Sequence, residues 1–298
     1  MHEVVIISGK GGTGKTSLTA AFAHLAENKV ICDLDVDAPD LHILLNPEIR
    51  QQEDFTSGFE AQIDADACES CGECMNMCRF DAVRRDVNGK YVIDPLRCEG
   101  CKVCVAFCPA DAVKFTPRHC GKWMISGTRY GTMIHAQLFP GEENSGRLVT
   151  LLKNKAREIA ETEGRELVLC DGAPGIGCPV ISSLSGTDLA VAVTEPTPSG
   201  RHDLARVAEL CDHFRVRVVV IINKYDLNAN ETRLIEEFAS RKGCEVIAKL
   251  PHDPVITVAM IHRKAVTEVR ENVFNPLIRD AWSRICGCLA ETSQTANT

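Results

Sequence analysis

The sequence predicts an α/β fold, with a mainly parallel sheet, helices on both faces and a small Cys-rich α+β insert. Strands alternate with helices along most of the chain, and this alternation requires parallel pairing with right-handed crossovers. Apolar runs such as Val218–Ile222 contain no polar residue, as strands buried on both faces require. The insert is marked by eight of the chain's 16 cysteines, which fall in two regular clusters.

The composition is that of a soluble globular protein with room for one large domain and a small insert. The 298 residues are 45% apolar and 25% charged. A net charge of -8 disfavours unspecific binding to nucleic-acid phosphates. Glu3 lies where an export signal would have basic residues, and no apolar run is long enough to cross a bilayer. We therefore expect a cytoplasmic protein with neither a membrane nor a nucleic-acid partner.

The predicted elements alternate before and after the insert. Residues 3–8 predict a strand, residues 15–28 a helix and residues 29–34 a second buried strand. After the insert, strands are expected at 132–139, 166–172, 189–195, 216–223 and 244–250, and helices near 146–162, 199–213 and 228–242. Residues 275–290 predict a last docking helix, and the polar residues 291–298 predict a disordered end.

A Gly-rich loop between the first strand and the first helix has the spacing of a phosphate-binding P-loop. Residues 9–16 read GKGGTGKT, which satisfies G-x-x-x-x-G-K-[ST]. Glycines let backbone N–H groups converge on phosphate oxygens, and the helix start adds its positive end. Lys15 would contact the β- and γ-phosphates, and Thr16 would bind Mg²⁺. The predicted nucleotide-binding residues are Gly9, Gly11, Gly12, Thr13, Gly14, Lys15, Thr16 and Ser17. A Gly-rich turn that binds nothing is the alternative, and the strand–loop–helix order argues against it.

The insert contains the motif C-x₂-C-x₂-C-x₃-C twice, 30 residues apart, which indicates a duplicated unit. Three closely spaced thiolates suit three irons of a cubane, and the fourth iron needs a ligand from elsewhere. Zinc is the alternative metal, but zinc sites usually pair two C-x₂-C units across a longer gap. The candidate ligands are Cys68, Cys71, Cys74, Cys78, Cys98, Cys101, Cys104 and Cys108.

This run is similar to that of bacterial two-cluster ferredoxins, in which the fourth cysteine of each run ligates the other cluster. The resemblance implies two [4Fe–4S] clusters with exchanged fourth ligands. One would be held by Cys68, Cys71, Cys74 and Cys108, and the other by Cys98, Cys101, Cys104 and Cys78. The ferredoxin run ends in proline, which is kept at Pro109 but replaced by Arg79 in the first repeat. This departure puts the loop geometry in question, but not the number of ligands.

Lys10 gives the P-loop the form GKGGTGKT, which resembles the deviant Walker A motif of the MinD/ParA and nitrogenase iron-protein superfamily. In that superfamily the early lysine reaches across a dimer interface to the partner's nucleotide. The resemblance therefore implies a homodimer that closes over two ATP molecules, with Lys10 and Lys15 as catalytic residues. A solvated loop lysine is the alternative for Lys10.

Two further segments resemble the switches of that superfamily. DLDVDAPDL (Asp33–Leu41) follows the second strand, and Asp35 matches the acid that positions or activates the attacking water. Asp33 and Asp37 would either cap the turn or lie near Mg²⁺. DGAPG (171–175) closes an apolar strand; the resemblance implies that Asp171 holds the Mg²⁺ shell and that Gly175 senses the γ-phosphate through its backbone.

Asn223, at the end of the run IINK, matches the amide that reads adenine in the superfamily. The run PHDP (251–254) resembles the loop that flanks the base. Helix capping is the alternative for both Asn223 and Asp253. Cys178 lies at the offset from Asp171 at which the nitrogenase iron protein has a ligand of its dimer-bridging cluster. A third, interface cluster is one interpretation of Cys178, and a small residue at a helix start is the other.

The chain as a whole resembles MinD-superfamily P-loop ATPases that contain an inserted ferredoxin domain. The expected domains are the first part of the ATPase (1–59), the insert (60–117) and the second part of the ATPase (118–298). The insert separates the two switches, so we expect the nucleotide state to control the clusters. The predicted function is Mg-dependent ATP hydrolysis that gates electron transfer to a redox partner protein. The alternative is ATP-dependent assembly or delivery of an iron–sulfur or mixed-metal cofactor to an acceptor protein.

Overall fold

The computed structural model describes residues 1–142 and 145–295, which divide into two compact units. The core unit comprises Met1–Glu53, Trp123–Gln137 and the described residues from Ser145 on. The insert unit comprises Asp54–Lys122 and the described residues from Leu138 to 142. It is therefore wider than the predicted insert at 60–117, and it includes a short second stretch of chain.

A nine-stranded sheet has the order β11-β10-β9-β1-β8-β2-β7-β6-β3. Pairing is parallel from β11 to β7, which confirms the predicted parallel α/β sheet. The strands of this part are β1 (His2–Ser8), β2 (Lys29–Asp33), β7 (Gly131–Leu138), β8 (Leu167–Pro174), β9 (Leu189–Thr194), β10 (Arg217–Asn223) and β11 (Glu245–Leu250).

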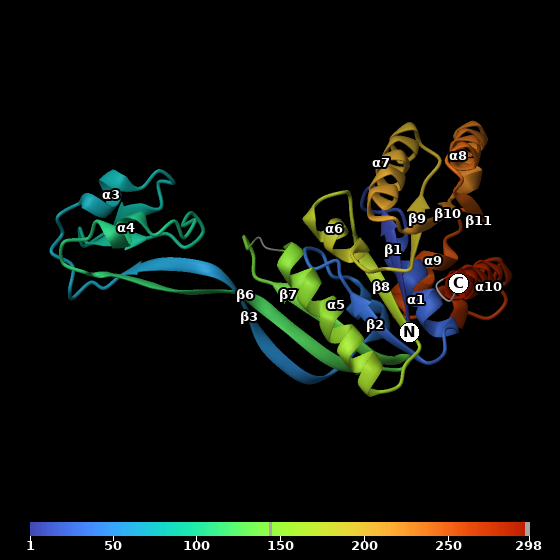
Figure 1. Cartoon of the computed structure of the whole chain (residues 1–298), viewed down its shortest axis with the longest axis horizontal. Coiled ribbons are helices and arrows are strands. Elements are labelled where there is room, and N and C mark those ends of the chain that lie inside the picture. The colour runs from blue at the N-terminus through green and yellow to red at the C-terminus, as the bar shows by residue number, and fades with distance from the viewer. Residues whose placement is uncertain (143–144, 296–298) are drawn as a thin grey trace. The chain divides into compact units, whose positions relative to one another are not determined.

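Helices cover both faces of the sheet (Figure 1). Val4 and Ile6 of β1 pack in the cluster that holds the buried faces of α1 and α10, while Val5 and Ile7 are buried on the opposite face. This is the alternation that a strand buried on both sides requires. The helices are α1 (Lys15–Leu25), α2 (Leu41–Leu45), α5 (Ser145–Thr162), α6 (Cys178–Leu184), α7 (Pro198–Phe214), α8 (Ala229–Arg241), α9 (Val255–Ile261) and α10 (Phe274–Thr295).

The C-terminal helix is longer than the sequence predicts. Residues 291–295, predicted to be disordered, continue α10, and residues 296–298 lie outside the described residues. The helix docks through Ile278, Ala281 and Ile285, and Trp282 lies 5.4 Å from the ring of Phe22. Among the described residues, no helix has the length and apolar content needed to span a membrane.

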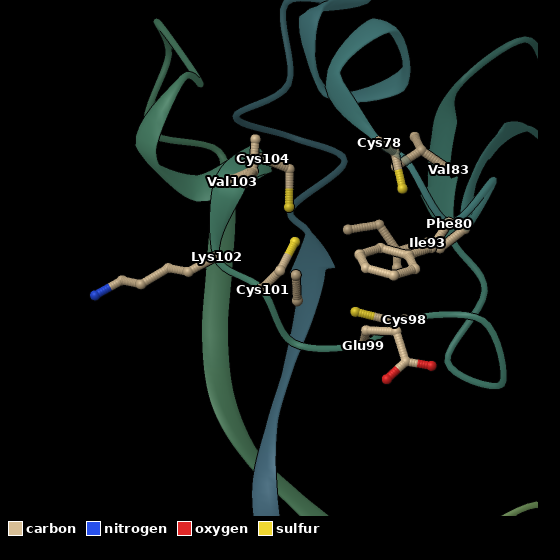
Figure 2. Close-up of a pocket in the computed structure, with 12 residues that line it drawn as sticks. Cys78, Phe80, Val83, Ile93, Cys98, Glu99, Cys101, Lys102, Val103 and Cys104 are labelled. Atoms are coloured by element: carbon tan, nitrogen blue, oxygen red, sulfur yellow. The ribbon is translucent and has the colours of Figure 1, made fainter.

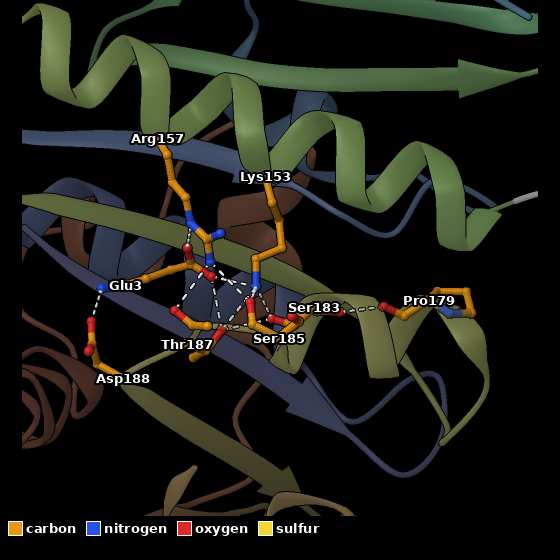
Figure 3. A network of polar contacts seen from close by, with 9 residues as sticks. Glu3, Lys153, Arg157, Pro179, Ser183, Ser185, Thr187 and Asp188 are labelled. Atoms are coloured by element: carbon orange, nitrogen blue, oxygen red, sulfur yellow. Dashed lines mark hydrogen bonds and ion pairs between the residues drawn. The ribbon is translucent and has the colours of Figure 1, made fainter. Parts of the chain in front are cut away.

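A buried polar network anchors the start of β1 (Figure 3). The carboxylate of Glu3 is paired with the Lys153 ammonium at 2.5 Å and with the Arg157 guanidinium at 2.7 Å, both from α5. Lys153 also donates to the carbonyls of Ser183 and Ser185 at the end of α6. Since buried charges need partners, this network ties α5 and α6 to the central strand.

Two long strands, β3 (Glu48–Ile63) and β6 (Val113–Thr128), were not predicted from the sequence. They are neighbours in the sheet, and each belongs partly to the core unit and partly to the insert unit. Residues 48–54 of β3 are all exposed, so this strand lacks the apolar alternation that reveals a half-buried strand. The chain thus enters and leaves the Cys-rich segment through continuous strands.

The insert unit has an internal repeat in its backbone as well as in its sequence. Helices α3 (Glu73–Met77) and α4 (Val103–Ala106) occupy matching positions, and β4 (Val83–Arg85) pairs antiparallel with β5 (Tyr91–Ile93). The two repeats exchange hydrogen bonds. Asp64 N–H donates to the Ala112 carbonyl at 2.8 Å, and Asp94 N–H donates to the Ala82 carbonyl at 2.7 Å. Each repeat therefore begins by pairing with the end of the other.

Candidate functional site

A cleft of about 460 Å³ opens in the core unit beside the Gly-rich loop. Its walls follow the carboxyl ends of parallel strands, which is where ligands bind in open α/β sheets. The volume suits a small-molecule ligand. The lining includes the predicted residues Gly11, Gly12, Gly14, Lys15, Thr16, Ser17, Asp35, Asn223 and Asp253. Ala38, Asp40, Pro174 and Lys224 also line the cleft; they belong to motifs noted in the sequence but were given no role there. Ile256 and Met260 line it too, and nothing in the sequence singled them out.

Two glycines of the loop, Gly9 and Gly14, could not be replaced without a clash. Gly14 has φ 90°, and a Cβ there would lie 2.5 Å from the side-chain nitrogen of Asn223. A Cβ at Gly9 would lie 2.3 Å from Cβ of Asp203 on α7. Thr13 lies between them; its side chain is buried, and its carbonyl accepts a hydrogen bond from Asn223 at 2.8 Å. The loop is therefore held in place by its neighbours before any ligand binds.

Lys15 projects from the start of α1 into a group of carboxylates. Its ammonium lies 3.3 Å from Asp35 and 3.9 Å from Asp171. Burial works against the charge of Lys15, but the nearby carboxylates of Asp171 and Asp35 outweigh it and raise the pKa of the ammonium. Lys15 therefore stays charged, as a residue that holds a phosphate must.

Asp33 and Asp171, which lie near the ends of β2 and β8, are buried opposite each other. Thr19 donates to Asp171 at 2.8 Å, and Asp33 accepts the N–H of Asp35 at 3.2 Å. One oxygen of each carboxylate has no hydrogen-bond partner among the described residues. Burial, and then the charge of Asp171, raise the pKa of Asp33 well above its usual range. The unpaired oxygens of Asp33 and Asp171 are hard donors of the kind that Mg²⁺ binds, so a cation could take the place of the proton that burial favours here.

The segment after β2 places its three acids differently. Asp35 lines the cleft, and burial raises the pKa of its carboxyl against the opposing effect of Lys15. Asp33 accepts the N–H of Asp35 and so caps the turn, which is one of its two predicted alternatives; a position near Mg²⁺ stays a prediction. Asp37 is exposed and does not line the cleft. Of these acids, Asp35 is therefore the one placed to meet a ligand directly.

The predicted phosphate sensor and base-reading residues are engaged within the chain. The N–H of Gly175 donates to the Ser8 carbonyl at 2.8 Å. Asn223 lines the cleft, but its amide braces the loop at Thr13 and accepts the N–H of Lys224 at 3.0 Å. Asp253 also lines the cleft, and it accepts the N–H of Val255 in the first turn of α9. For Asp253 the capping alternative is therefore present in the structure.

Lys10, predicted to reach a second copy, is paired within its own chain. Its ammonium lies 3.6 Å from the Glu195 carboxylate, which also binds Lys224 at 2.5 Å. The Lys10 carbonyl accepts the hydroxyl of Ser8 at 2.7 Å. Glu195 follows β9 and was not singled out by the sequence. It holds two lysines at the edge of the cleft.

In the insert unit, the eight predicted cysteines line two cavities in groups of four. The first cysteine cavity is lined by Cys68, Cys71, Cys74 and Cys108. The second cysteine cavity is lined by Cys78, Cys98, Cys101 and Cys104. Figure 2 shows the four sulfur atoms of the second cavity turned toward the same space. Each cavity thus combines three cysteines of one repeat with the fourth cysteine of the other.

The backbone around the two cysteine cavities repeats in detail. Left-handed residues occur at Ser70 and Gly72 in the first repeat, and at Gly100 and Lys102 in the second. Successive N–H groups in such turns point inward and form the concavities that many iron–sulfur sites use. Burial, and then the neighbouring thiols of Cys98 and Cys101, raise the pKa of Cys104 to about 11. Without a ligand, the Cys104 thiol is therefore protonated and neutral at pH 7.

The remaining cysteines are separate from these cavities. Cys32, Cys120 and Cys170 are buried, and Cys178 is exposed at the start of α6. Within the described residues, no group of three or more His, Cys, Asp or Glu side chains is arranged to hold a single metal ion, and this includes the two cysteine groups. Both interpretations of Cys178 stay predictions.

Comparisons with known proteins agree with the fold and with the cleft. The chain matches the model of the CobQ/CobB/MinD/ParA nucleotide binding domain over residues 4–265. It is 36% identical over 229 residues to the uncharacterized protein MJ0578 of Methanocaldococcus jannaschii, covering 76% of this chain and 79% of that protein. A second uncharacterized protein of that organism, MJ0579, is 27% identical over 76% of this chain and 82% of its own length.

Solved structures share the fold at low sequence identity. MinD of Aquifex aeolicus is 19% identical with a TM-score of 0.55, covering 96% of this chain and 98% of its own. MinD of Pyrococcus horikoshii, complexed with Mg-ADP, is 15% identical with a TM-score of 0.57 over 95% of each chain. McdA of Cyanothece, in an ATP complex, is 15% identical with a TM-score of 0.58, covering 97% and 96%. Because the family model spans most of its length, the chain belongs to the CobQ/CobB/MinD/ParA nucleotide-binding family.

Proposed function

We propose that the protein is an ATPase whose nucleotide state controls two [4Fe–4S] clusters, and that it gates electron transfer to a partner protein. The observation that carries the proposal is the grouping of the cysteines. Each cavity gathers three cysteines from one repeat and one from the other, which is the exchange used by two-cluster ferredoxins. The nucleotide cleft of the same chain supplies the site at which ATP would act.

At the cleft, the chain's residues bind, orient and neutralise the triphosphate. Backbone N–H groups of Gly11–Thr16 would cradle the phosphates, and the Lys15 ammonium would leave its carboxylates to contact the β- and γ-oxygens. Asp171 and the hydroxyl of Thr16 would hold Mg²⁺, which neutralises the phosphate charge. Asp35 would accept a proton from the attacking water or orient it. Fixed groups of this kind accelerate phosphoryl transfer mainly by stabilising the charge of its transition state.

In the insert unit, the residues fit two cubanes. The thiols are gathered in fours, and the N–H of Ala112 already lies 3.3 Å from the sulfur of Cys108. Hydrogen bonds of this kind tune cluster potentials. Cys71 and Cys101 are exposed, so each cavity has one edge near solvent. When bound, the clusters supply one-electron chemistry, and this edge gives a partner protein an approach to them.

The connection between the two sites supports control of one by the other. The insert lies between Asp33–Leu41 and residues 171–175, the segments that resemble nucleotide switches. Strands β3 and β6 run without a break between the two units. Under this proposal, a shift at a switch would reach the cysteines along these two strands.

We further propose a homodimer that closes over two nucleotides. Lys10 would leave Glu195 and contact the phosphates bound by a second copy. The loop N–H of Gly175 would likewise leave the Ser8 carbonyl to meet a γ-phosphate. Both residues are held by single contacts that a triphosphate can replace, so the proposed dimer depends on ATP rather than on ADP.

The test is a redox titration of protein purified without air, with and without Mg·ATP. We expect ATP to change the cluster potentials or the rate of their reduction. Lys15→Ala should lower ATP turnover about 100-fold or more and abolish the nucleotide effect, yet keep the brown colour. Lys155→Ala, a surface lysine paired with Glu158, is the matched control.

Each result has a distinct meaning. ATP hydrolysis that persists in Lys15→Ala would show that the nucleotide site is wrong. Clusters whose potential and kinetics ignore Mg·ATP in the unmodified protein would remove the gating proposal but leave the ATPase. Transfer of intact clusters to an apo-protein, driven by ATP, would favour cofactor delivery instead.

A further inference from the structure

A separate cavity of about 410 Å³ lies in the core unit, outside the nucleotide cleft. We call it the histidine cavity. Its walls include His42 and Ile43 of α2, Ile49 of β3, Met124 of β6, His135 of β7 and Arg263. Its volume is close to that of the nucleotide cleft and falls within the range of small-molecule sites. None of these six residues lines the nucleotide cleft.

The charge of the histidine cavity is opposite to that of the protein. The chain has a net charge of -8, yet no carboxylate is found among the described residues that line this cavity. Arg263 contributes a permanent positive charge. One of its five N–H donors bonds to the side-chain oxygen of Asn46 at 3.2 Å, which holds the guanidinium at the cavity. This environment favours a ligand that carries negative charge.

His135 adds a fixed polar group rather than a second permanent charge. Its Nε2 lies 2.9 Å from the hydroxyl of Ser126, which is fully buried. Burial, and then the nearby His42, lower the pKa of His135 to about 4. The ring is therefore neutral at pH 7 and held at one angle, as a hydrogen-bonding group for a ligand should be.

The rest of the histidine cavity combines the polar side chains of His42, Asn46 and Gln137 with an apolar, partly open wall. Ile43 is 48% exposed and Ile49 is 55% exposed, while Met124 is buried. Large aliphatic side chains that remain exposed beside a hollow gain free energy when a ligand covers them. The cavity thus offers apolar contact next to one guanidinium and one neutral imidazole.

We propose that the histidine cavity binds a small organic anion with an apolar body, such as an aromatic or branched-chain carboxylate. Arg263 would pair with the carboxylate, and Ile43 and Ile49 would cover the apolar part. The segment after β2 forms a wall of both sites, because Ala38 and Asp40 line the nucleotide cleft and Pro39 lines the histidine cavity. The ligand would therefore contact a nucleotide switch from its outer side.

Binding is tested with 8-anilinonaphthalene-1-sulfonate, a fluorescent anion with an apolar body. All titrations contain saturating Mg·ADP, so the nucleotide cleft is occupied. We expect saturable binding of about one probe per chain, weakened about tenfold or more by Arg263→Gln because a charge-assisted hydrogen bond is lost. Lys264→Gln removes the same charge from the next residue, which does not line the cavity, and should leave binding unchanged.

A second pair of variants tests the apolar wall without disturbing the fold. Ile43→Ser should weaken the probe several-fold, whereas Val258→Ser should not. Val258 is 47% exposed, like Ile43, but lies on α9 outside the cavity. Aromatic carboxylates should displace the probe, and their primary amides should not at equal concentration.

Three results would overturn the proposal. They are the absence of saturable binding, equal losses in Arg263→Gln and Lys264→Gln, and displacement by amides as readily as by carboxylates. None of these results depends on ATP hydrolysis or on iron, so they leave the proposed function untouched.

Discussion

The two units of this protein place their candidate ligands differently. In the core unit, the large apolar cluster around Phe22, Phe274 and Ile285 is separate from the nucleotide cleft, whose residues lie at the ends of strands. In the insert unit, the buried clusters are small, and they include Cys74 and Cys98 themselves. The core unit therefore has a complete apolar core without a nucleotide. In the insert unit, bound iron would form part of the core. Small units with little apolar core depend on such metals for stability.

Removal of iron should give the largest difference between the two units, because it should unfold the insert unit and leave the core unit folded. Chelation under reducing conditions should abolish hydrogen-exchange protection in residues 64–113 while nucleotide binding persists, because only the insert unit uses its ligands as core. The measurement is hydrogen exchange of holo and chelated protein with bound Mg·ADP. A chelated insert unit that keeps its protection would show that its apolar contacts suffice without metal.

Single cysteine variants sharpen the same point. Cys74→Ser should lower the iron content from about eight to about four atoms per chain, since one cubane loses a ligand. Cys120→Ser is the control, because Cys120 is equally buried in the insert unit but lies outside both cysteine cavities. Its thiol lies 3.3 Å from the Ser57 carbonyl, and a serine can keep that hydrogen bond. Equal iron loss in both variants would contradict the assignment of ligands.

Loss of a buried ion pair in the core unit should lower its stability without changing the iron content. Lys153→Met leaves Glu3 without its closest cation and should lower the free energy of unfolding of the core unit by about 3 kcal/mol. Iron content should not change. Lys155→Met, at an exposed pair on the same helix, should cost less than about 1 kcal/mol. Denaturant unfolding followed by intrinsic fluorescence measures the change in stability, and iron analysis measures the cluster content. A loss of iron in Lys153→Met would contradict the prediction, because it would show that the stability of the core unit affects metal binding in the insert unit.

The smallest expected effect at neutral pH concerns His135, whose contribution changes only as the pH falls. Burial lowers its pKa from the usual 6.5 to about 4, so the unfolded chain binds the extra proton first. Stability from this residue is complete above about pH 6.5 and falls as the pH drops toward 4, by roughly 3 kcal/mol in total. His135→Asn should remove this slope, and the difference between the two unfolding profiles isolates it from the carboxylates. Parallel profiles would show that the buried ring is protonated at the same pH in both states.

Much of the core unit could be predicted from the sequence because its signals are local. The strand–loop–helix order around Lys15, and the apolar runs of β1 and β10, predicted elements that the structure confirms with boundary shifts of a few residues. The strands β3 and β6 escaped prediction, since residues 48–54 of β3 are exposed and the apolar residues of neither strand alternate clearly. The last residues of α10 were missed for a related reason, because polar composition alone suggested disorder.

In the candidate site, too, the sequence predicted the residues that belong to local motifs and not those that only the fold brings together. Motif spacing identified the loop residues Gly9–Thr16, and the resemblance to the MinD/ParA superfamily identified the acids Asp33, Asp35 and Asp171. Neither assigned a role to Glu195, which holds Lys10 and Lys224, or to Met260, which lines the cleft. These residues come from different strands and helices and share no pattern in the chain. Their roles in catalysis and binding stay predictions until they are measured.

The sequence by itself determined the alternating fold, the phosphate loop and the number of cysteine groups, because each depends on residues spaced by a few positions. Tertiary structure alone decided that Asp33 and Asp171 face each other on paired strands. The structure groups the eight cysteines in the two sets of four that the resemblance to two-cluster ferredoxins implied. It also placed Arg263 and His135, far apart in the chain, around one cavity. The physical reason is that spacing along a chain encodes local backbone geometry, whereas contacts between distant segments arise only when burial of apolar surface brings those segments together.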